Sequence, residues 1–417
     1  MLVKGKIPSL EPIVTIGLVM PEDEQTSITI NTSLDNQVFS IKTDDKKLDI
    51  NGKIIDEIIL KEEKNQIFKL NPIKAGRGFH WEKEISISVL GNVHIQNENG
   101  YLFIKNNIKL EKYLTCVATS EMSGDCPLAL LEAQTIAARS WLLAAQEQKH
   151  TILELDACND DCCQRYQGIK NLTDSAILAS QNTRGKVLFY NSKVCDTRYS
   201  KSCGGITENN ENVWFDEPKP YLRGILDSPE GVLPDLTDHN EMKKWVLEKN
   251  NCFCNSKQFQ ESSLEQYLGI VDKDDSYFRW EYTVTANQLI QLILDKVGIS
   301  FDKILELIPL ERGISGRITK MEIKGISNNK PHDFLIQSEY EIRRVLHPKF
   351  LYSSAFIIIA NSDTDTFLSQ LTLKGSGWGH GVGLCQIGSL GMALEGKSYN
   401  QILSHYFLST ELKKIYD

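Results

Sequence analysis

The segment that most restricts the fold is "GSGWGHGVGLCQIGSLGMA" at residues 375–393, in which seven of the nineteen residues are glycine. A flexible linker would combine glycine with serine and other polar residues, whereas this segment contains Trp378, Leu384 and Ile387. Glycine has no Cβ, so a glycine-rich backbone can pass close to another group. We therefore expect the backbone of this segment to lie in close contact with another group.

The composition is that of a globular protein. The 417 residues are 41% hydrophobic and 24% charged, enough for more than one domain or for one domain with insertions. The net charge of −9, without a long Lys/Arg run, argues against nucleic-acid binding. No stretch reaches the roughly 18 to 20 apolar residues of a membrane span. The short apolar patch at 13–20 lies between prolines and predicts a strand, so we see no export signal.

The order of sequence patterns predicts an α+β protein with a β-rich N-terminal part. Residues 1–75 alternate short apolar runs with polar turns, which is typical of small antiparallel strands. The turn "NENG" at 97–100 indicates a further hairpin. Helical patterns follow over 108–148, and an amphipathic helix is predicted over 285–308. We therefore expect a mixed domain with helical insertions after the β-rich part.

A glutamate interrupts the apolar face of the first predicted helix. In "IKLEKYLTCVATSEM" (108–122) the apolar residues follow helical spacing, and the next position of that face is Glu121. A second helix is expected to begin after it, with Asp125 as its N-cap. Two interpretations are open for Glu121. Burial can raise its pKa, as a general acid requires, or it can pair with a buried arginine such as Arg139.

The cysteines are concentrated in "HTILELDACNDDCCQRYQG", which contains His150, Cys158, Cys162 and Cys163. Thiolates with an imidazole are typical zinc ligands. Adjacent cysteines do not readily bind one ion together, so Cys162 and Cys163 are not expected to be equivalent. Buried thiols or a disulfide are the alternative. The pair Cys252 and Cys254 is interpreted as packing.

A second glycine turn lies in "RYSKSCGGITENNENVW", beside Ser200 and Ser202. Hydroxyl groups next to Gly204 and Gly205 could line a sugar-binding cleft, with Trp214 as a stacking surface, or the pair could simply form a tight turn. The chain lacks a G-x-S-x-G motif and a phosphate-binding glycine motif. These absences argue against a serine hydrolase and a nucleotide-binding protein.

Four blocks, in this order, resemble the sporulation stage II protein D family, also called the SpoIID/LytB domain. They are "IKLEKYLTCVATSEM…PLALLEAQTIAARSW", "CQRYQG", "YSKSCGGITENNENVW…PYL" and "GSGWGHGVGLCQIGSLGMALEGKSYNQILSHYF". The resemblance predicts a SpoIID-like catalytic domain over 78–417, with an insertion at about 228–310. Residues 1–77 are left as a small β-rich region.

The resemblance implies a lytic transglycosylase. Such an enzyme cuts peptidoglycan glycan strands that lack stem peptides, between MurNAc and GlcNAc, and leaves 1,6-anhydro-MurNAc ends. It implies Glu121 as the single catalytic acid and base, and a structural zinc ion on His150, Cys158 and Cys163, with Cys162 as a further candidate ligand. Substrate contacts are expected at Gln134, Arg139, Tyr166, Ser200, Ser202, Gly204, Gly205, Trp378, His380 and Gln386.

The chemistry of this reaction agrees with a single carboxylate. Inverting and retaining glycosidases need two carboxylates at a defined separation, and no second one is paired with Glu121 by the sequence pattern. A transglycosylase uses an internal hydroxyl of its substrate as the nucleophile. The alternatives are a non-catalytic amidase enhancer or wall-binding protein, and a hydrolase whose zinc activates water. Peptidoglycan and a cell-wall amidase are the expected partners, at the cell envelope, in sporulation or division.

Overall fold

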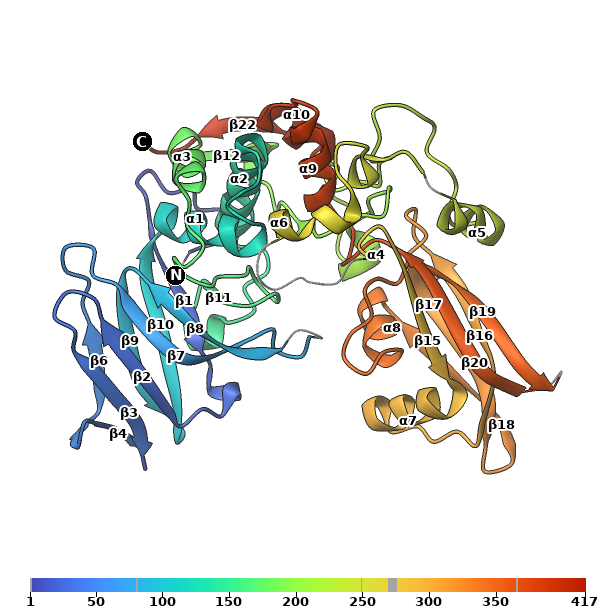
Figure 1. Cartoon of the computed structure of the whole chain (residues 1–417), viewed down its shortest axis with the longest axis horizontal. Coiled ribbons are helices and arrows are strands. Elements are labelled where there is room, and N and C mark those ends of the chain that lie inside the picture. Colours follow the sequence, from blue (N-terminus) through green and yellow to red (C-terminus); the bar gives the residue numbers. More distant parts are fainter. Residues whose placement is uncertain (1, 80–81, 249, 269–275, 365–366) are drawn as a thin grey trace. The chain divides into compact units, whose positions relative to one another are not determined.

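The computed structural model describes residues 2–79, 82–248, 250–268, 276–364 and 367–417 (Figure 1). The chain forms two compact units. The first unit contains Met1–Asp196, Glu265–Lys273 and Glu411–Asp417, and the second contains Thr197–Leu264 and Asp274–Thr410. The β-rich N-terminal region thus shares a unit with the helices that follow residue 108.

Two sheets form most of the N-terminal half of the first unit (Figure 1). One has the order β11-β1-β10-β9-β6, and the other β5-β4-β3-β2-β7-β8. Their strands are β1 (Ile13–Val19), β2 (Ser27–Thr32), β3 (Val38–Asp44), β4 (Lys47–Ile50), β5 (Lys53–Ile55), β6 (Glu57–Leu60), β7 (Phe68–Ala75), β8 (Lys83–Val89), β9 (Asn92–Glu98), β10 (Tyr101–Lys109) and β11 (Ala157–Cys158), with the 3₁₀ helix η1 at Pro21–Asp23. The predicted β-rich N-terminal part is confirmed. The predicted hairpin is β9–β10, whose turn residues Asn99 and Gly100 have φ of 55° and 93°.

The helical part of the first unit follows β10 directly. It contains α1 (Leu110–Glu121), α2 (Leu128–Ala144), η2 (Thr151–Leu153), α3 (Asp174–Asn182) and α6 (Glu265–Leu268), and the sheet β13-β12-β22 formed by β12 (Lys186–Tyr190), β13 (Lys193–Val194) and β22 (Glu411–Lys414). The helices predicted within 108–148 are therefore confirmed. The N-cap prediction for α2 was wrong: the cap is Pro127, and the helix begins at Leu128, three residues after Asp125.

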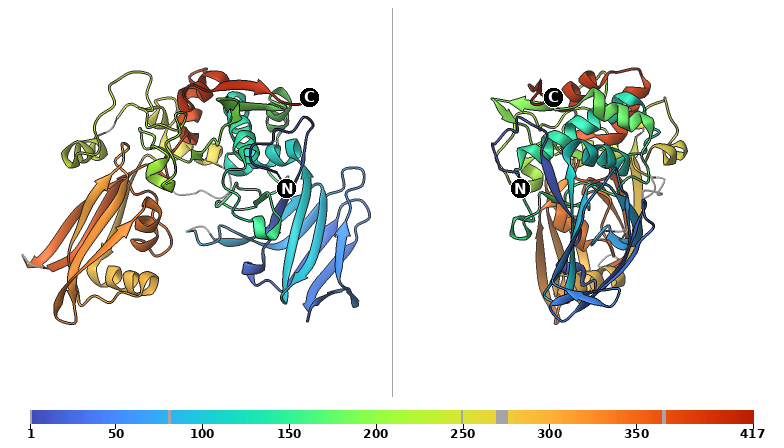
Figure 2. Two further views of the ribbon diagram at one scale, coloured as in Figure 1. Left: turned by 180° about the vertical axis from the view of Figure 1, so that it is seen from behind. Right: turned by 90° about the vertical axis from the view of Figure 1, so that its left-hand side faces the viewer.

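The second unit contains three small sheets with helices packed on them (Figure 2). The sheets are β14-β21, β15-β20-β19 and β16-β17-β18. The strands are β14 (Tyr199–Ser200), β15 (Arg279–Thr285), β16 (Lys303–Arg312), β17 (Ile318–Ser327), β18 (Lys330–Gln337), β19 (Phe356–Thr364), β20 (Phe367–Ser376) and β21 (Leu384–Cys385). The helices are α4 (Glu211–Trp214), α5 (His239–Leu247), η3 (Phe253–Asn255), η4 (Glu261–Ser263), α7 (Ala286–Val297), α8 (Glu339–Val345), α9 (Gln386–Leu394) and α10 (Tyr399–Tyr406). Helices α7 and α8 cover the apolar core between the β15–β20 and β16–β18 strands.

The long amphipathic helix predicted over 285–308 is only partly present. Helix α7 begins after a capping box on Thr285 and ends at Val297. The next residue, Gly298, has a φ of 78°, which is the left-handed conformation that commonly ends a helix. Residues from Lys303 onward form β16 and pair with β17. Apolar residues in short strands and in helices can share a spacing over a few residues, which explains the error.

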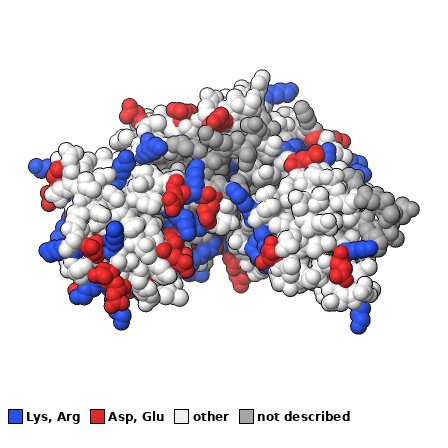
Figure 3. Space-filling view, turned by 60° about the horizontal axis from the view of Figure 1, so that its bottom comes forward, with Lys and Arg blue, Asp and Glu red and all other residues white. Residues whose placement is uncertain are grey.

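The surface carries charges of both signs. On the face drawn in Figure 3, Lys and Arg side chains are interspersed with Asp and Glu side chains on each unit. Among the described residues, we find no helix with the length and apolar character needed to span a bilayer.

Candidate functional site

Glu121 is the last residue of α1 and is nearly buried. Its side chain retains 8% of its accessible surface. The backbone N–H of Arg165 donates a hydrogen bond to Oε1 of Glu121 over 2.9 Å. A carboxylate held by a backbone amide has a fixed orientation, because the amide cannot rotate away as a flexible side chain could. The sequence pattern therefore identified a carboxylate that the fold holds in one orientation at the end of a helix.

The segment "CQRYQG" packs on the last turn of α1 and holds Glu121 in place. The N–H of Gln167 donates to Oγ of Ser120 over 2.9 Å, and that hydroxyl donates to the carbonyl of Cys116 over 2.6 Å. Tyr166 is fully buried and donates its hydroxyl to Oδ1 of Asn106 on β10 over 2.8 Å. The predicted blocks 108–122 and 163–168 are thus in direct contact.

Arg139 does not pair with Glu121, so the specific ion pair considered as an alternative was wrong. The guanidinium of Arg139 contacts both carboxylate oxygens of Glu111, with Nε 3.0 Å from Oε1, and donates to the carbonyl of Lys186. Arg139 and Gln134 are fully buried on α2. Contacts between these two side chains and a substrate stay a prediction.

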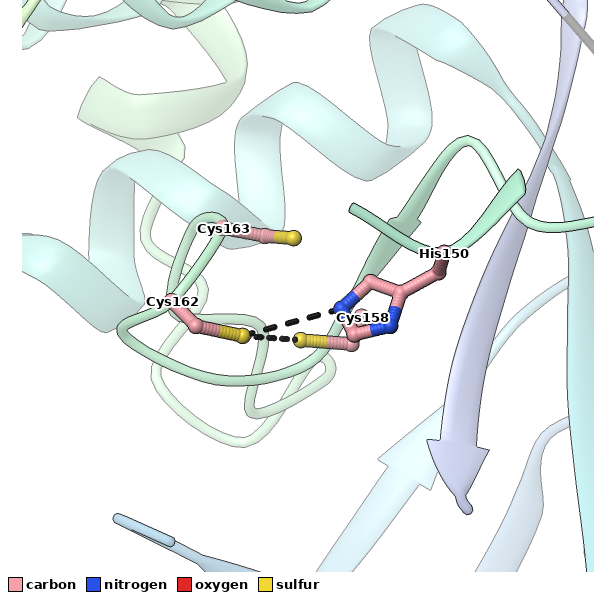
Figure 4. Close-up of side chains that lie close together, drawn as sticks. All are labelled: His150, Cys158, Cys162 and Cys163. Carbon is pink, nitrogen blue, oxygen red and sulfur yellow. Dashed lines mark hydrogen bonds between the residues drawn. The ribbon is translucent and has the colours of Figure 1, made fainter. Parts of the chain in front are cut away.

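The side chains of His150, Cys158, Cys162 and Cys163 converge on one point (Figure 4). Their ligand atoms all lie within 4.8 Å of one another. The Sγ atoms of Cys158 and Cys162 are 3.1 Å apart, and Nε2 of His150 is 3.7 Å from Sγ of Cys162. The sulfur separation is longer than the roughly 2.05 Å of a disulfide bond. The structure brings Cys162 and Cys163 to the same point although they are adjacent in the sequence.

The donor set of this cluster fits a zinc ion. Three sulfur atoms and one imidazole nitrogen are a common tetrahedral zinc environment. A hydrogen bond from the thiol of Cys158 lowers the pKa of Cys162, while the same bond raises the pKa of Cys158 well above its ordinary value. A lowered pKa favours the thiolate, which is the form of cysteine that ligates a metal ion, so the direction of this shift agrees with a metal site.

The loop that carries these cysteines is also fixed to the N-terminal sheets. Asp160 accepts hydrogen bonds from the backbone N–H groups of Gly76 and Arg77, over 2.9 and 2.7 Å. The Arg77 side chain bridges Asp23 and Asp160, with contacts of 2.6 and 3.2 Å. Residues 1–77 thus support the segment beside Glu121. Sequence reasoning missed this role, because an isolated Arg or Asp in a loop carries no pattern.

The backbone of the glycine run packs closely against other residues of the second unit. Gly381 has a φ of 78°, and a Cβ at this position would lie 2.3 Å from the guanidinium carbon of Arg317. A Cβ at Gly383, with a φ of 74°, would lie 2.2 Å from the carbonyl oxygen of Arg198. The expected close approach is confirmed at these positions, and the groups approached belong to the protein.

Two of the predicted site segments meet in this unit. Ser202 and Trp378 exchange backbone hydrogen bonds of 3.1 and 2.8 Å, and strands β14 and β21 pair in parallel. Ser202 is completely buried, whereas Ser200 and Trp378 each retain 7% exposure. Trp378 stacks on Tyr352 with ring centroids 4.4 Å apart. Most of the Trp378 ring is therefore committed to packing.

The imidazole of His380 has a fixed orientation. Its Nδ1 accepts the N–H of Val382 over 3.0 Å, and its ring lies 4.9 Å from that of Trp214. Burial, followed by the charges of nearby arginines such as Arg198, lowers the pKa of His380 well below its ordinary value. An acceptor at Nδ1 leaves the ring proton on Nε2. This arrangement suits a hydrogen-bond donor rather than a group that changes its charge.

Sequence reasoning assigned no role to Arg317, which organises the glycine run. It is completely buried and donates to the carbonyl of Gly379 through Nε and Nη2, over 3.2 and 3.0 Å. A third nitrogen donates to Oγ of Ser315, and that hydroxyl donates to the buried carboxylate of Glu208. Gln386 is also nearly fully buried, at the start of α9. Glu121 belongs to the first unit and these residues to the second, so a shared substrate site stays a prediction.

Two family models match the chain. Residues 98–190, which include Glu121 and the His150 cysteine cluster, match the model described as Stage II sporulation protein, SpoIID. Residues 208–383 match a domain of unknown function, DUF8618. The second match contains Arg317 and the first five glycines of the glycine run.

Three similar proteins come from Brachyspira hyodysenteriae and Bacillus subtilis. An uncharacterized protein of Brachyspira hyodysenteriae is 26% identical over 396 residues, which cover 94% of this chain and 90% of that protein. Stage II sporulation protein D of Bacillus subtilis is 24% identical, over 74% of this chain and 75% of the relative. The amidase enhancer of Bacillus subtilis is 25% identical over 71% of this chain, but only 39% of the enhancer is covered. The SpoIID match and the similarity to stage II sporulation protein D and the amidase enhancer support the assignment of this chain to the SpoIID family.

Proposed function

We propose that this protein is a lytic transglycosylase that cleaves peptidoglycan glycan strands, with Glu121 as its single catalytic acid and base. The observation that carries the proposal is the setting of Glu121 within the SpoIID match. It is a nearly buried carboxylate at the end of α1, held by the N–H of Arg165. The family membership supports a role in the cell wall and a location at the envelope.

The proposed reaction proceeds in two proton transfers. Protonated Glu121 first donates its proton to the glycosidic oxygen between MurNAc and GlcNAc. The resulting carboxylate then accepts the proton of the C6 hydroxyl of the same MurNAc, whose oxygen attacks C1 and closes the 1,6-anhydro ring. The nucleophile is part of the substrate, so its effective concentration replaces a second carboxylate and a water molecule. The fixed Glu121 carboxyl must reach both oxygens in turn.

We propose a structural zinc ion for the cluster of His150, Cys158, Cys162 and Cys163. Four protein donors leave no open coordination position for a water molecule. The ion would cross-link the ends of the segment from His150 to Cys163. Arg165, whose N–H holds Glu121, follows Cys163 by two residues. Zinc would therefore support the orientation of Glu121 without taking part in the reaction.

Product analysis tests the proposed reaction. The purified protein is incubated with glycan strands from which an amidase has removed the stem peptides, and the products are analysed by mass spectrometry. We expect fragments that end in 1,6-anhydro-MurNAc, which are lighter by one water than the products of hydrolysis. Reducing MurNAc ends would refute the transglycosylase and favour a hydrolase.

Matched variants test the role of Glu121. Glu121→Gln keeps the size of the side chain but cannot supply a proton, so we expect a rate loss of about 100-fold or more. Glu132→Gln is the control: Glu132 is as buried as Glu121, lies on the neighbouring helix and accepts a hydrogen bond from Asn182. Its activity should remain near that of the wild type. Full activity in Glu121→Gln contradicts the assignment.

The name of one relative favours a second candidate function. An amidase enhancer is similar to 71% of this chain, so we also consider a non-catalytic protein that stimulates a cell-wall amidase. In that case amidase activity on intact peptidoglycan should rise when this protein is added, and Glu121→Gln should stimulate it equally. Stimulation that requires Glu121 instead indicates that the amidase benefits from glycan cleavage.

A further inference from the structure

A second group of metal-ligating side chains lies in the second unit, apart from the cluster of Figure 4. Cys203, Asp227, Cys254 and Cys385 are all buried, with at most 2% exposure each. Their ligand atoms lie within 4.8 Å of one another. They come from four separate segments: the turn after β14, the loop before α5, helix η3 and strand β21.

The distances within this cluster suit a single tetrahedral ion. Sγ of Cys203 lies 3.7 Å from Sγ of Cys254 and 3.3 Å from Oδ2 of Asp227. With Zn–S bonds of about 2.3 Å and Zn–O bonds of about 2.0 Å, tetrahedral geometry requires separations of roughly 3.8 Å and 3.5 Å. The sulfur separation is far from the roughly 2.05 Å of a disulfide bond. An iron–sulfur cluster would place several atoms between its ligands and requires wider spacing.

The carboxylate of Asp227 is oriented by groups around it. The hydroxyl of Tyr406 donates to Oδ1 over 2.7 Å, and the N–H of Cys254 donates to Oδ2 over 3.3 Å. A Cβ at Gly388 would lie 2.6 Å from Oδ2, so only glycine leaves room for the carboxylate. Hydrogen bonds that fix a ligand through its second oxygen are typical of metal sites.

Backbone amides also point at the sulfur atoms. The N–H groups of Cys203 and Gly388 donate to Sγ of Cys385 over 3.2 and 3.3 Å, and the N–H of Gly205 faces Sγ of Cys203 at 3.4 Å. Donors of this kind stabilise thiolates rather than thiols. Nε2 of His405 lies 3.5 Å from Oδ1 of Asp227 and could compensate one negative charge at most, so a buried cluster of three thiolates and a carboxylate requires a further cation.

We propose that Cys203, Asp227, Cys254 and Cys385 bind a structural Zn²⁺ ion. Thiolate donors select soft or borderline ions such as Zn²⁺ over Mg²⁺ and Ca²⁺. Four protein ligands complete the coordination, so the ion has no position for water or substrate. It joins the turn that carries Ser202 and Gly204 to the middle of the glycine run, at Cys385. The site therefore fixes two of the segments that the sequence assigned to substrate binding.

Zinc content tests this site in the full-length protein. Metal is measured by elemental analysis and by native mass spectrometry after purification without chelators. We expect two zinc ions per chain in the wild type, one in Cys254→Ser or Asp227→Asn, and one in Cys158→Ser. Cys252→Ser is the matched control, because this buried cysteine lies two residues from Cys254 but outside the cluster. It should retain two ions.

Cobalt substitution gives an independent measurement where a variant folds poorly. The Cys158→Ser protein, loaded with Co²⁺, should show the thiolate-to-cobalt absorption of a site with three cysteines. A wild type with one zinc ion that Cys158→Ser removes would overturn the proposal. So would two ions in Cys254→Ser, an absence of the cobalt absorption, or a disulfide among Cys203, Cys254 and Cys385 in the intact mass of the unreduced protein.

Discussion

The buried ion pair between Glu111 and Arg139 allows a quantitative test of the first unit. Arg139 is completely inaccessible, and Glu111 is its only carboxylate partner among the described contacts. Glu111 also accepts hydrogen bonds from the hydroxyl of Tyr416 over 2.7 Å and from the N–H of Gly185 over 3.2 Å. One carboxylate therefore joins α1, α2 and the last residues of the chain.

Replacement of Glu111 by glutamine should destabilise this unit strongly. The variant keeps the shape of the side chain but leaves the guanidinium of Arg139 buried without a counter-charge. Breaking a buried pair in this way costs about 3–5 kcal/mol. For a unit of roughly 200 residues, each kcal/mol lowers the melting temperature by about 2–4 °C, so we expect a decrease of about 6–20 °C.

The effect should depend on pH. Burial by itself raises the pKa of Glu111, but the charge of Arg139 and the hydrogen bonds outweigh it, and the net pKa is lowered. A lowered pKa stabilises the folded state above the unfolded value of about 4.3, and this stability is lost as the pH falls through the folded-state pKa. The difference between wild type and Glu111→Gln should therefore be full at pH 7 and shrink in acid.

Thermal and urea unfolding of both proteins provide the measurement. Glu62→Gln is the control, because it removes a half-exposed pair with Lys112 at 3.0 Å that should contribute at most about 1 kcal/mol. A loss below 1 kcal/mol in Glu111→Gln, with native circular dichroism, would refute the reasoning. Such a result would also favour a substrate-binding role for Arg139, because the guanidinium would then not need Glu111 as its counter-charge.

Two further predictions concern the glycine run of the second unit. In urea unfolding, Gly381→Ala should be clearly more destabilising than Gly396→Ala. Both glycines have φ near 80°, which costs alanine about 1–2 kcal/mol. Only at Gly381 would the added Cβ also collide with a guanidinium, that of Arg317. Equal losses would contradict the close approach. His380 should remain neutral from pH 7 to pH 5.5 in NMR titration, because its pKa is lowered mainly by burial. A titration near the ordinary value of about 6.5 would contradict that environment.

The elements with strong local patterns could be predicted from the sequence. The spacing of apolar residues located α1 within two residues, and the "NENG" turn located the β9–β10 hairpin. The end of α7 was missed, because Val297 and the apolar residues of β16 continue a helical spacing and only the conformation of Gly298 separates them. Local pattern therefore predicts the type of an element better than its end.

The candidate site shows a different limit. Glu121 and the His150 cluster could be found because each occupies a short segment with unusual residue types. The partners of these residues could not be found, since the pairing of Arg139 with Glu111, or of Arg77 with Asp160, depends on which distant segments meet. Cys254 shows the same limit: beside Cys252 it resembled packing, and only the fold brings it to Cys203.

The glycine run changes how variants of this protein should be interpreted. The sequence predicted a close approach, and the structure shows that Gly381 and Gly383 approach Arg317 and Arg198. A larger residue at either position must displace a buried guanidinium or a backbone carbonyl, so it alters the fold before it alters any contact with a glycan. Reduced activity in a glycine variant therefore identifies a substrate contact only when unfolding measurements show an unchanged second unit. Glu121→Gln is the more direct probe, because it changes a proton donor while keeping its volume and its acceptor for the N–H of Arg165.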